Sequence, residues 1–270
     1  MREKIHKIRG DIKQKKPLIH CITNPISINQ CANAILALGA RPIMAEHPRE
    51  VAEITETAQA LLLNLGNITD ARMESIAISA ETASEQNIPF VLDAVGIACS
   101  NLRRNYIAEL LSHVTPSVIK GNYSEINALY QDAYRSSGVD ADSALEFQEM
   151  CRISAELAKE KNTVILASGK TDIVTDGHKL VLIRNGTAQL SCVTGTGCML
   201  GALCAAYLSS SELPESAATA CVVLGICGQL AETEEGSGTF MTGLMDCLST
   251  LTEEDINKYL NMEVIDLENN

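Results

Sequence analysis

Short apolar segments alternate with longer amphipathic segments along most of the chain. Apolar or β-branched runs bounded by Gly, Pro or Asn are typical of buried strands, whereas apolar residues spaced three or four positions apart are typical of helices. The pattern predicts strands at 18–22, 42–45, 61–64, 89–93, 117–120 and 163–167. It predicts helices at 26–38, 48–58, 70–86, 104–112, 124–130 and 144–161.

Repeated strand–helix units indicate a mostly parallel sheet with helices on both faces, an α/β fold. The pattern then changes, because segments 172–175 and 180–184 flank the turn Asp176–Gly177 and predict an antiparallel hairpin. After Gly197 the chain is rich in small residues and is predicted to be helical to about Tyr259. The acidic tail from Glu263 is predicted to fray. No linker or repeat interrupts the chain, so we expect a single domain over residues 1–270.

Composition narrows the classes of function. Hydrophobic residues make up 46% of the chain and aromatics 3%, so Leu, Ile, Val and Ala must fill the core. The net charge of −13 disfavours nucleic acid as a partner, and the one basic stretch, Lys13–Lys16, is interpreted as a solvated helix end. The ten cysteines form no CxxC pair and indicate a reducing compartment. With no signal-like start and no apolar run long enough for a membrane helix, we expect a cytoplasmic protein without membrane association.

Polar and functional side chains follow the predicted strands. In open α/β sheets, ligands bind outside the carboxyl ends of the strands, so these positions are the first candidates for a site. The residues at or just past a strand end are Asn24, Met44, Asn64, Asp93, Lys120 and Ser168.

The segment Val193–Cys198, of sequence VTGTGC, is the strongest local signal. Gly195 and Gly197 allow a sharp turn, and the helix that follows offers unpaired N–H groups and the positive end of its dipole. Gly195, Thr196, Gly197 and Cys198 would together form an anion hole. The segment is neither a Walker A loop nor a GxGxxG fingerprint, and a helix start that simply needs glycine is the alternative.

Cys198 lies in the first turn of that predicted helix, where the dipole would favour a thiolate. Such a group could take a proton from a substrate hydroxyl that attacks a phosphate. The alternative is a packed structural cysteine, which nine other cysteines in the chain make plausible.

A second signal is the segment Lys120–Glu125, of sequence KGNYSE. Asn122 and Glu125 are three residues apart at a predicted helix start, so they can face the same way. Glu125 could hold Mg²⁺ and Lys120 could meet a phosphate, whereas an ordinary N-cap with an acidic first turn is the alternative.

Other candidates have equally simple structural alternatives. The hydroxyl of Ser168, beside Gly169, could bind phosphate or belong to a plain turn, and Asp93 could position a metal or cap a helix. Asn24 could bind a ring nitrogen or hydroxyl. Met44 could form a soft wall for a flat heterocycle or belong to the core, and His20 is interpreted as a core histidine.

Five ordered motifs resemble the hydroxyethylthiazole kinase family of the ribokinase-like superfamily, over about residues 17–260. They are His20–Asn24, Pro42–Ala45, Leu92–Gly96, Ile119–Asn122 with Glu125, and Thr194–Cys198. The resemblance implies ATP- and Mg²⁺-dependent phosphorylation of 4-methyl-5-(2-hydroxyethyl)thiazole in thiamine salvage. It also implies a homotrimer with active sites between neighbouring subunits.

The resemblance also implies residue roles. Met44 and Gly195 would bind the thiazole, and Lys120 and Ser168 would contact ATP. Asn122, Glu125 and Asp93 would serve the metal–phosphate region, and Cys198 would stand where the wider superfamily usually has an aspartate base.

The chain departs from the family pattern at three positions. Lys120 stands where the family more often has Arg, so the charge is kept but the two-pronged hydrogen bonding of a guanidinium is lost. Ser168 stands in place of Thr and keeps the hydroxyl. Ala94 stands in place of a proline.

Three rival functions stay open at the level of sequence. The same fold could phosphorylate a pyrimidine or a sugar alcohol, or the chain could be a non-catalytic nucleotide or thiazole sensor. An NAD-dependent enzyme is the third, and the lack of GxGxxG in the first strand–helix–strand unit argues against it.

Overall fold

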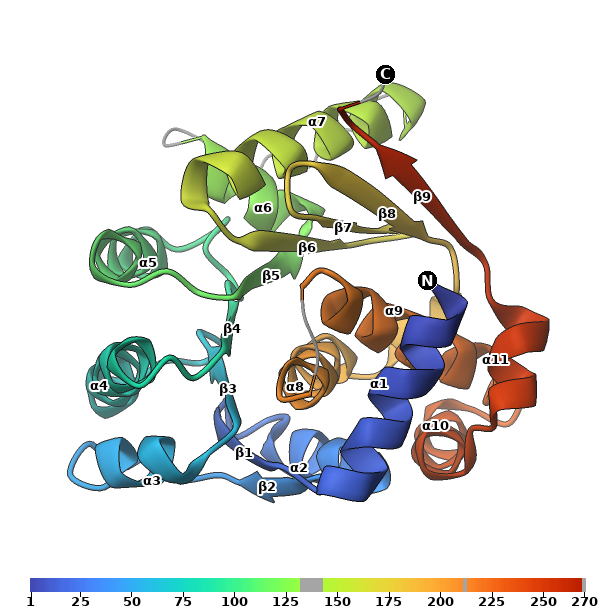
Figure 1. Cartoon of the computed structure of the whole chain (residues 1–270), viewed down its shortest axis with the longest axis horizontal. Helices are drawn as coiled ribbons and strands as arrows, with labels where there is room; N and C mark the ends of the chain where they lie inside the picture. Colours follow the sequence, from blue (N-terminus) through green and yellow to red (C-terminus); the bar gives the residue numbers. More distant parts are fainter. Residues whose placement is uncertain (132–142, 211–212, 269–270) are drawn as a thin grey trace.

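The protein is described by a computed structural model that covers residues 1–131, 143–210 and 213–268. Within these residues, nine strands form one sheet in the order β2-β1-β3-β4-β5-β6-β7-β8-β9. Helices cover both faces of this sheet (Figure 1). The predicted α/β fold with a mostly parallel central sheet is therefore confirmed.

The first six strands of the sheet order are parallel to one another. Their bounds are Arg41–Ile43 (β2), Leu18–Ile22 (β1), Ala60–Asn64 (β3), Phe90–Asp93 (β4), Val118–Asn122 (β5) and Val164–Ser168 (β6). Parallel pairing brings the carboxyl ends of these strands to one edge, where the candidate residues lie.

The predicted hairpin is also confirmed: β7 (Asp172–Thr175) and β8 (Lys179–Ile183) pair in an antiparallel ladder. Gly177 in the connecting turn has φ 86°, a left-handed conformation that glycine adopts without strain.

The tail from Glu263 does not fray as predicted where the structure describes it, and residues 269–270 lie outside the described residues. It forms β9 (Met262–Asp266), which pairs antiparallel with β8. Tertiary structure decides this, because β8 offers an open edge for a ladder and Arg184 donates to Glu263 at 2.8 Å.

The helices divide between the two faces of the sheet (Figure 1). One face carries α1 (Arg2–Lys15), α2 (Ile28–Ala37), α8 (Thr196–Leu208), α9 (Glu215–Leu230), α10 (Ser237–Thr250) and α11 (Glu253–Tyr259). The other carries α3 (Val51–Thr57), α4 (Asp70–Glu85), α5 (Asn101–His113), α6 (Tyr123–Tyr130) and α7 (Ser143–Lys161). The predicted helical region after Gly197 is confirmed where it is described, and its residues 211–212 lie outside the described residues.

Helix α8 lies deep in the molecule, with every residue from Met199 to Leu208 buried. Its small residues allow it to approach the sheet closely: a Cβ added at Gly201 would lie 3.0 Å from Leu62 Cδ1 and 3.3 Å from Asp93 Oδ2. This close approach places the first turn of α8 over the carboxyl ends of the central strands.

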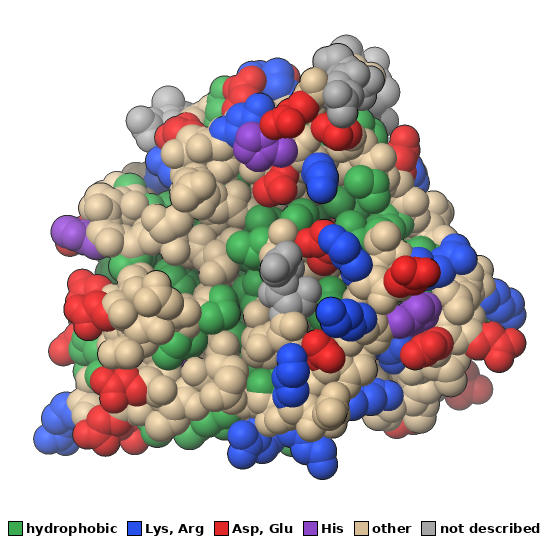
Figure 2. All heavy atoms as spheres, in the orientation of Figure 1, with side chains coloured by type: hydrophobic (Ala, Val, Ile, Leu, Met, Phe, Trp, Pro, Cys, Tyr) green, Lys and Arg blue, Asp and Glu red, His purple; other side chains and the backbone are tan. Residues whose placement is uncertain are grey.

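On the surface in Figure 2, basic and acidic side chains are interspersed rather than gathered in a basic patch. Among the described residues, no helix has the length and apolar character needed to cross a membrane.

Candidate active site

Three polar side chains form a row across neighbouring strands. Asn64 on β3 is in register with Asp93 on β4, and Asp93 is in register with Lys120 on β5. Asn64 and Asp93 are the last residues of their strands, and Lys120 is the middle residue of β5. All three contact the side of the sheet that α8 covers, Asn64 at Cys198, Asp93 near Gly201 and Lys120 near Gly197. The sheet register therefore assembles a polar cluster from residues about 30 positions apart in sequence.

Lys120 and Asp93 form a buried ion pair at the centre of this row. Lys120 Nζ lies 3.0 Å from Asp93 Oδ1 and 3.1 Å from Asp93 Oδ2, with the two residues 4% and 0% exposed. Burial raises the pKa of Asp93 to about 6, although the positive charge of Lys120 lowers it. Burial is the largest effect on Lys120 and disfavours its charge, but Asp93, Cys198 and Glu125 together outweigh burial and the pKa of Lys120 is raised. Both groups are therefore charged at neutral pH.

Cys198 is linked to the polar row by two asparagines. Asn24 Nδ2 lies 3.3 Å and Asn64 Nδ2 3.4 Å from Cys198 Sγ. Asn64 Nδ2 also donates to Asp93 Oδ2 at 2.8 Å, and Asn24 Nδ2 donates to Asn64 Oδ1 at 3.2 Å. The structure thus brings the predicted residues Asn24, Asp93, Lys120 and Cys198 into one connected network.

The turn before α8 has the features expected of an anion site. Gly195 is the N-cap with φ 91°, and no side chain caps the helix within the described residues. Gly197 is exposed, and a Cβ added there would lie 3.6 Å from Lys120 Nζ. Uncapped amides at a helix N-terminus suit an anion such as phosphate, and the ammonium of Lys120 lies beside them.

Glu125 is held by backbone amides next to this cluster. Its Oε1 accepts from the N–H of Gly96 at 2.7 Å, and its Oε2 accepts from the N–H of Asn122 at 2.8 Å. Asn122 Oδ1 in turn accepts from the N–H of Glu125 at 2.9 Å, which makes a capping box at the start of α6. The motif therefore does form the helix cap that was the alternative interpretation. The same hydrogen bonds hold the carboxylate of Glu125 near Asp93.

A cavity of about 700 Å³ adjoins the anion site. Ser168 lines it from the end of β6, and Thr196 and Gly197 line it from α8, so two of the predicted signals meet there. Its walls also include Asp172, Arg184, Leu190, Leu200 and Leu224. The cavity wall thus combines polar and charged side chains with apolar ones.

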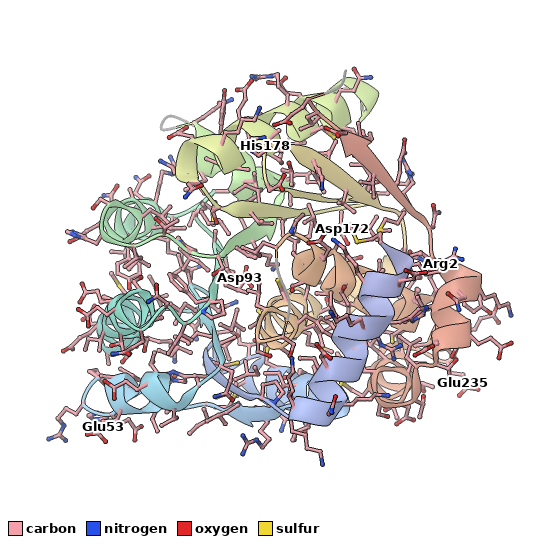
Figure 3. All side chains as sticks on the ribbon, viewed as in Figure 1. Arg2, Glu53, Asp93, Asp172, His178 and Glu235 are labelled. Carbon is pink, nitrogen blue, oxygen red and sulfur yellow. The ribbon has the colours of Figure 1, made fainter. Side chains whose placement is uncertain are left out.

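The cavity wall contains the carboxyl group of Asp172, and burial raises the pKa of this group to about 6. The hydrogen bond from the N–H of Gly169 lowers this pKa, but its effect is smaller than that of burial. Figure 3 places Asp93 and Asp172 in the interior beside α8 and α9, whereas Glu53 and Glu235 lie at the periphery.

We expect Asp172→Asn to stabilise the fold at neutral pH but not at pH 4. The folded pKa exceeds the unfolded value of 3.8, so the contribution of Asp172 to stability is complete below pH 3.8 and is lost as the pH rises through about 6. Asn keeps an acceptor for Gly169 and carries no charge. Urea unfolding from pH 4 to 8 should show a variant advantage that grows to about 2–3 kcal/mol above pH 6. An advantage that does not change with pH would contradict this reasoning.

Comparison with known proteins agrees with this geometry. The model of the hydroxyethylthiazole kinase family matches residues 10–254. The chain is 46% identical to hydroxyethylthiazole kinase 2 of Clostridium botulinum over 260 residues, which cover 94% of this chain and 98% of the relative. The chain belongs to the hydroxyethylthiazole kinase family.

Solved structures agree with this assignment. The structure of the hydroxyethylthiazole kinase protein from Pyrococcus horikoshii superposes with a TM-score of 0.90 at 32% identity, covering 98% of this chain and 100% of that one. A ribokinase-like superfamily protein from Enterococcus faecalis superposes with a TM-score of 0.64 at 13% identity, covering 92% and 89%, and shows the shared fold alone. The predicted resemblance to the hydroxyethylthiazole kinase family is confirmed.

One residue from each of the first two motifs that match the hydroxyethylthiazole kinase family can now be placed. His20 is fully buried, with Nδ1 3.1 Å from Thr55 Oγ1 and Nε2 2.9 Å from the carbonyl of Ala45, so its interpretation as a core histidine is confirmed. Met44 follows β2 and packs, partly buried, against the same core cluster as Cys198. Its role toward the thiazole stays a prediction.

Sequence reasoning assigned no role to Asn64, although it noted the residue at a strand end. Its place at the end of a strand was the only signal that the sequence offered. The partners of Asn64 come from β4, α8 and the segment after β1, which are all distant in sequence. Arg184, Leu190 and Leu224 in the cavity wall gave no sequence signal.

Proposed function

We infer that this chain transfers the γ-phosphate of ATP to the hydroxyl of 4-methyl-5-(2-hydroxyethyl)thiazole, as a thiamine-salvage kinase. The observation that carries the proposal is the uncapped start of α8 over the row Asn64–Asp93–Lys120, with Cys198 hydrogen-bonded to that row. Membership of the hydroxyethylthiazole kinase family supports it.

In this proposal, catalysis is mainly positioning and neutralisation of charge, as in other phosphoryl transfers. The amides of Gly195, Thr196, Gly197 and Cys198 would hold the oxygens of the transferred phosphoryl group while negative charge develops on them. Lys120, beside Gly197, would share its ammonium between Asp93 and a phosphate oxygen. Ser168 and Asn122, in register at the ends of β6 and β5, would contact ATP.

As a thiolate, Cys198 would accept the proton of the substrate hydroxyl and become a neutral thiol, while the hydroxyl oxygen forms the new bond to phosphorus and the bond to ADP breaks. Asn24, which hydrogen-bonds to this sulfur, would orient the thiazole together with Gly195, and Met44 would contact its ring.

The side chains present fit Mg²⁺ held through its water ligands, because each carboxylate oxygen of Asp93 and Glu125 already accepts a hydrogen bond. The ion is usually bound by one or two carboxylates together with substrate phosphates, and Asp93 and Glu125 are two such groups close enough to influence each other electrostatically. No group of three metal-ligating side chains occurs in the described part of the chain, so the phosphates would have to complete the coordination. Bound there, Mg²⁺ would offset the negative charge of the triphosphate.

We further propose that residues 1–270 form one kinase domain, that it assembles as a homotrimer, and that it works in the cytoplasm. The continuous sheet order supports the first, and all ten cysteines are free thiols, which suits a reducing compartment. Ile26, 57% exposed and two residues from Asn24, is an apolar side chain beside the site that a neighbouring subunit could cover.

The proposal is tested by incubating the protein with ATP, Mg²⁺ and hydroxyethylthiazole and detecting the phosphate ester by mass. 4,5-Dimethylthiazole, which lacks the hydroxyl, is the matched control and should yield no ester. ADP release from a pyrimidine or sugar alcohol, but not from hydroxyethylthiazole, would identify a different substrate. ATP binding without turnover of any alcohol would favour a sensor and overturn the proposal.

We expect Cys198→Ala to keep measurable kinase activity and Cys198→Asp to be active. A primary alcohol needs little help from a base when the transition state is loose, so the anion site should contribute more than the base. Steady-state assays of both variants, with folding checked by circular dichroism, provide the measurement. Complete loss of activity in both folded variants would show that this weighting is wrong.

A further inference from the structure

Asn64 occupies an unusual position between two functional groups. It is fully buried at the end of β3, and both atoms of its amide are engaged. Its Oδ1 accepts from the N–H of Gly66 at 2.8 Å and from Asn24 Nδ2 at 3.2 Å. Its Nδ2 lies 2.8 Å from Asp93 Oδ2 and 3.4 Å from Cys198 Sγ.

The surroundings fix which way this amide points. The N–H of Gly66 can only donate, so it must face Oδ1 of Asn64, and the carboxylate of Asp93 requires a donor and must face Nδ2. Asn24 is fixed in the same way, because its Oδ1 accepts from the N–H groups of Ile26 and Ser27 at 3.1 Å each. Both asparagines therefore turn their N–H groups toward the sulfur of Cys198.

We propose that Asn64 is a positioning residue for the phosphoryl transfer and acts through Cys198. Its N–H holds the sulfur as a hydrogen-bond acceptor at a fixed point between Asn24 and Asp93. Hydrogen bonds from donors stabilise negative charge on the atom that accepts them, so this arrangement suits a sulfur that must take up a proton. The same amide group also donates to the carboxylate of Asp93, which accepts from Lys120. Asn64 therefore connects Cys198, on the substrate side of the site, with Lys120, on the phosphate side.

The kinetic test is a double-mutant cycle with Asn64→Ala and Cys198→Ala, and it rests on the proposed kinase function. In the wild-type background, Asn64→Ala should lower kcat about tenfold, roughly the effect of losing one hydrogen bond to a charged group. KM for either substrate should change less than about twofold. In the Cys198→Ala background, the same change should cost less than about twofold in kcat, because the group on which Asn64 acts is gone.

A second measurement does not depend on kinase activity. The rate of alkylation of Cys198 by iodoacetamide at one mildly alkaline pH, resolved by mass spectrometry, should fall severalfold in the Asn64 variant. Cys99, which is exposed, provides an internal control whose rate should stay the same. If the wild type phosphorylates no thiazole, this measurement still decides whether Asn64 controls the reactivity of the Cys198 thiol. Failure of the proposed kinase function can therefore be distinguished from failure of the proposed role of Asn64.

Asn64→Asp is the second variant if Asn64→Ala does not fold. Beside Asp93 the new carboxyl must stay protonated, because two adjacent buried carboxylates cannot both ionise. It has the same size, retains an acceptor for Gly66 and Asn24, and gives its one hydrogen to Asp93, so none faces Cys198. It should slow alkylation of Cys198 as the alanine variant does. Equal loss of kcat with and without Cys198, or an unchanged alkylation rate in a folded variant, would overturn the proposal.

Discussion

Replacing Lys120 with Met is expected to lower the free energy of unfolding by about 3–5 kcal/mol at neutral pH. The carboxylate of Asp93 is fully buried, and Lys120 is its only cationic partner among the described residues. Without the ammonium, the folded protein must either bury an unpaired charge or protonate Asp93. Both alternatives cost stability, and urea unfolding followed by circular dichroism measures the loss.

The pH dependence of this loss follows from the pKa of Asp93, which burial raises to about 6 even with Lys120 present. A folded pKa above the unfolded value of 3.8 gives stability that is complete below pH 3.8 and is lost as the pH rises. Because Lys120 opposes the effect of burial, its removal should raise the pKa of Asp93 further and widen this window. The deficit of the variant should therefore shrink as the pH falls toward 4.

The matched control is the double variant Lys120→Met with Asp93→Asn, which removes both charges together. An amide at position 93 needs no counter-charge, so the double variant should recover much of the stability. If the two single changes add without any recovery, the ion pair is not what holds this part of the site.

Replacing Gly195 with Ala is expected to lower kcat/KM by about 10²–10³-fold, the usual effect of losing one preorganised donor to a developing negative charge. Gly195 has φ 91°, and a Cβ there would lie 3.1 Å from Ser27 Cβ. The turn must therefore shift, and the first amides of α8 would shift with it. ADP release at limiting hydroxyethylthiazole measures the change.

Gly236 provides a control that also has a positive φ and also begins a helix. It is the N-cap of α10 with φ 113°, no side chain caps that helix, and a Cβ at this glycine would meet nothing within 4 Å. Both alanine variants should lose stability from the positive φ, and Gly236→Ala should lose at least as much, because ψ 175° places it in a region that almost only glycine adopts. Gly236→Ala should nevertheless keep full activity per folded molecule. Similar activity losses in both variants would attribute the effect to general destabilisation rather than to the anion site.

The chemistry of the site could be predicted from the sequence only where residue type and local spacing carry it. Gly195 and Gly197 before a helix indicate an anion site because their backbone freedom is a local property. Asn122 and Glu125 share one face because three positions make nearly one helical turn, and the capping box follows from that spacing. The contact of Asn64 with Cys198 has no local signature, because the two residues are 134 positions apart.

The same distinction applies to the ends of the chain. The strongly charged start was interpreted no further than a solvated helix end at Lys13–Lys16, although Ile5, Ile8 and Ile12 are buried in α1. The acidic tail was predicted to fray, yet it completes the sheet as β9. In both cases the polar composition gave no indication of a regular element. Contacts with distant parts of the fold stabilise α1 and β9.

By itself the sequence determined the alternation of strands and helices, the edge of the sheet at which polar residues gather, and the glycine turn that precedes α8. These features follow from periodicity and backbone freedom, which act over a few neighbouring residues. Only the tertiary structure decided that Asn64, Asp93 and Lys120 stand in one row, that Lys120 pairs with Asp93, and that two asparagines turn their N–H groups to Cys198. Strand register and helix packing set those contacts, and both depend on the whole core closing around the sheet.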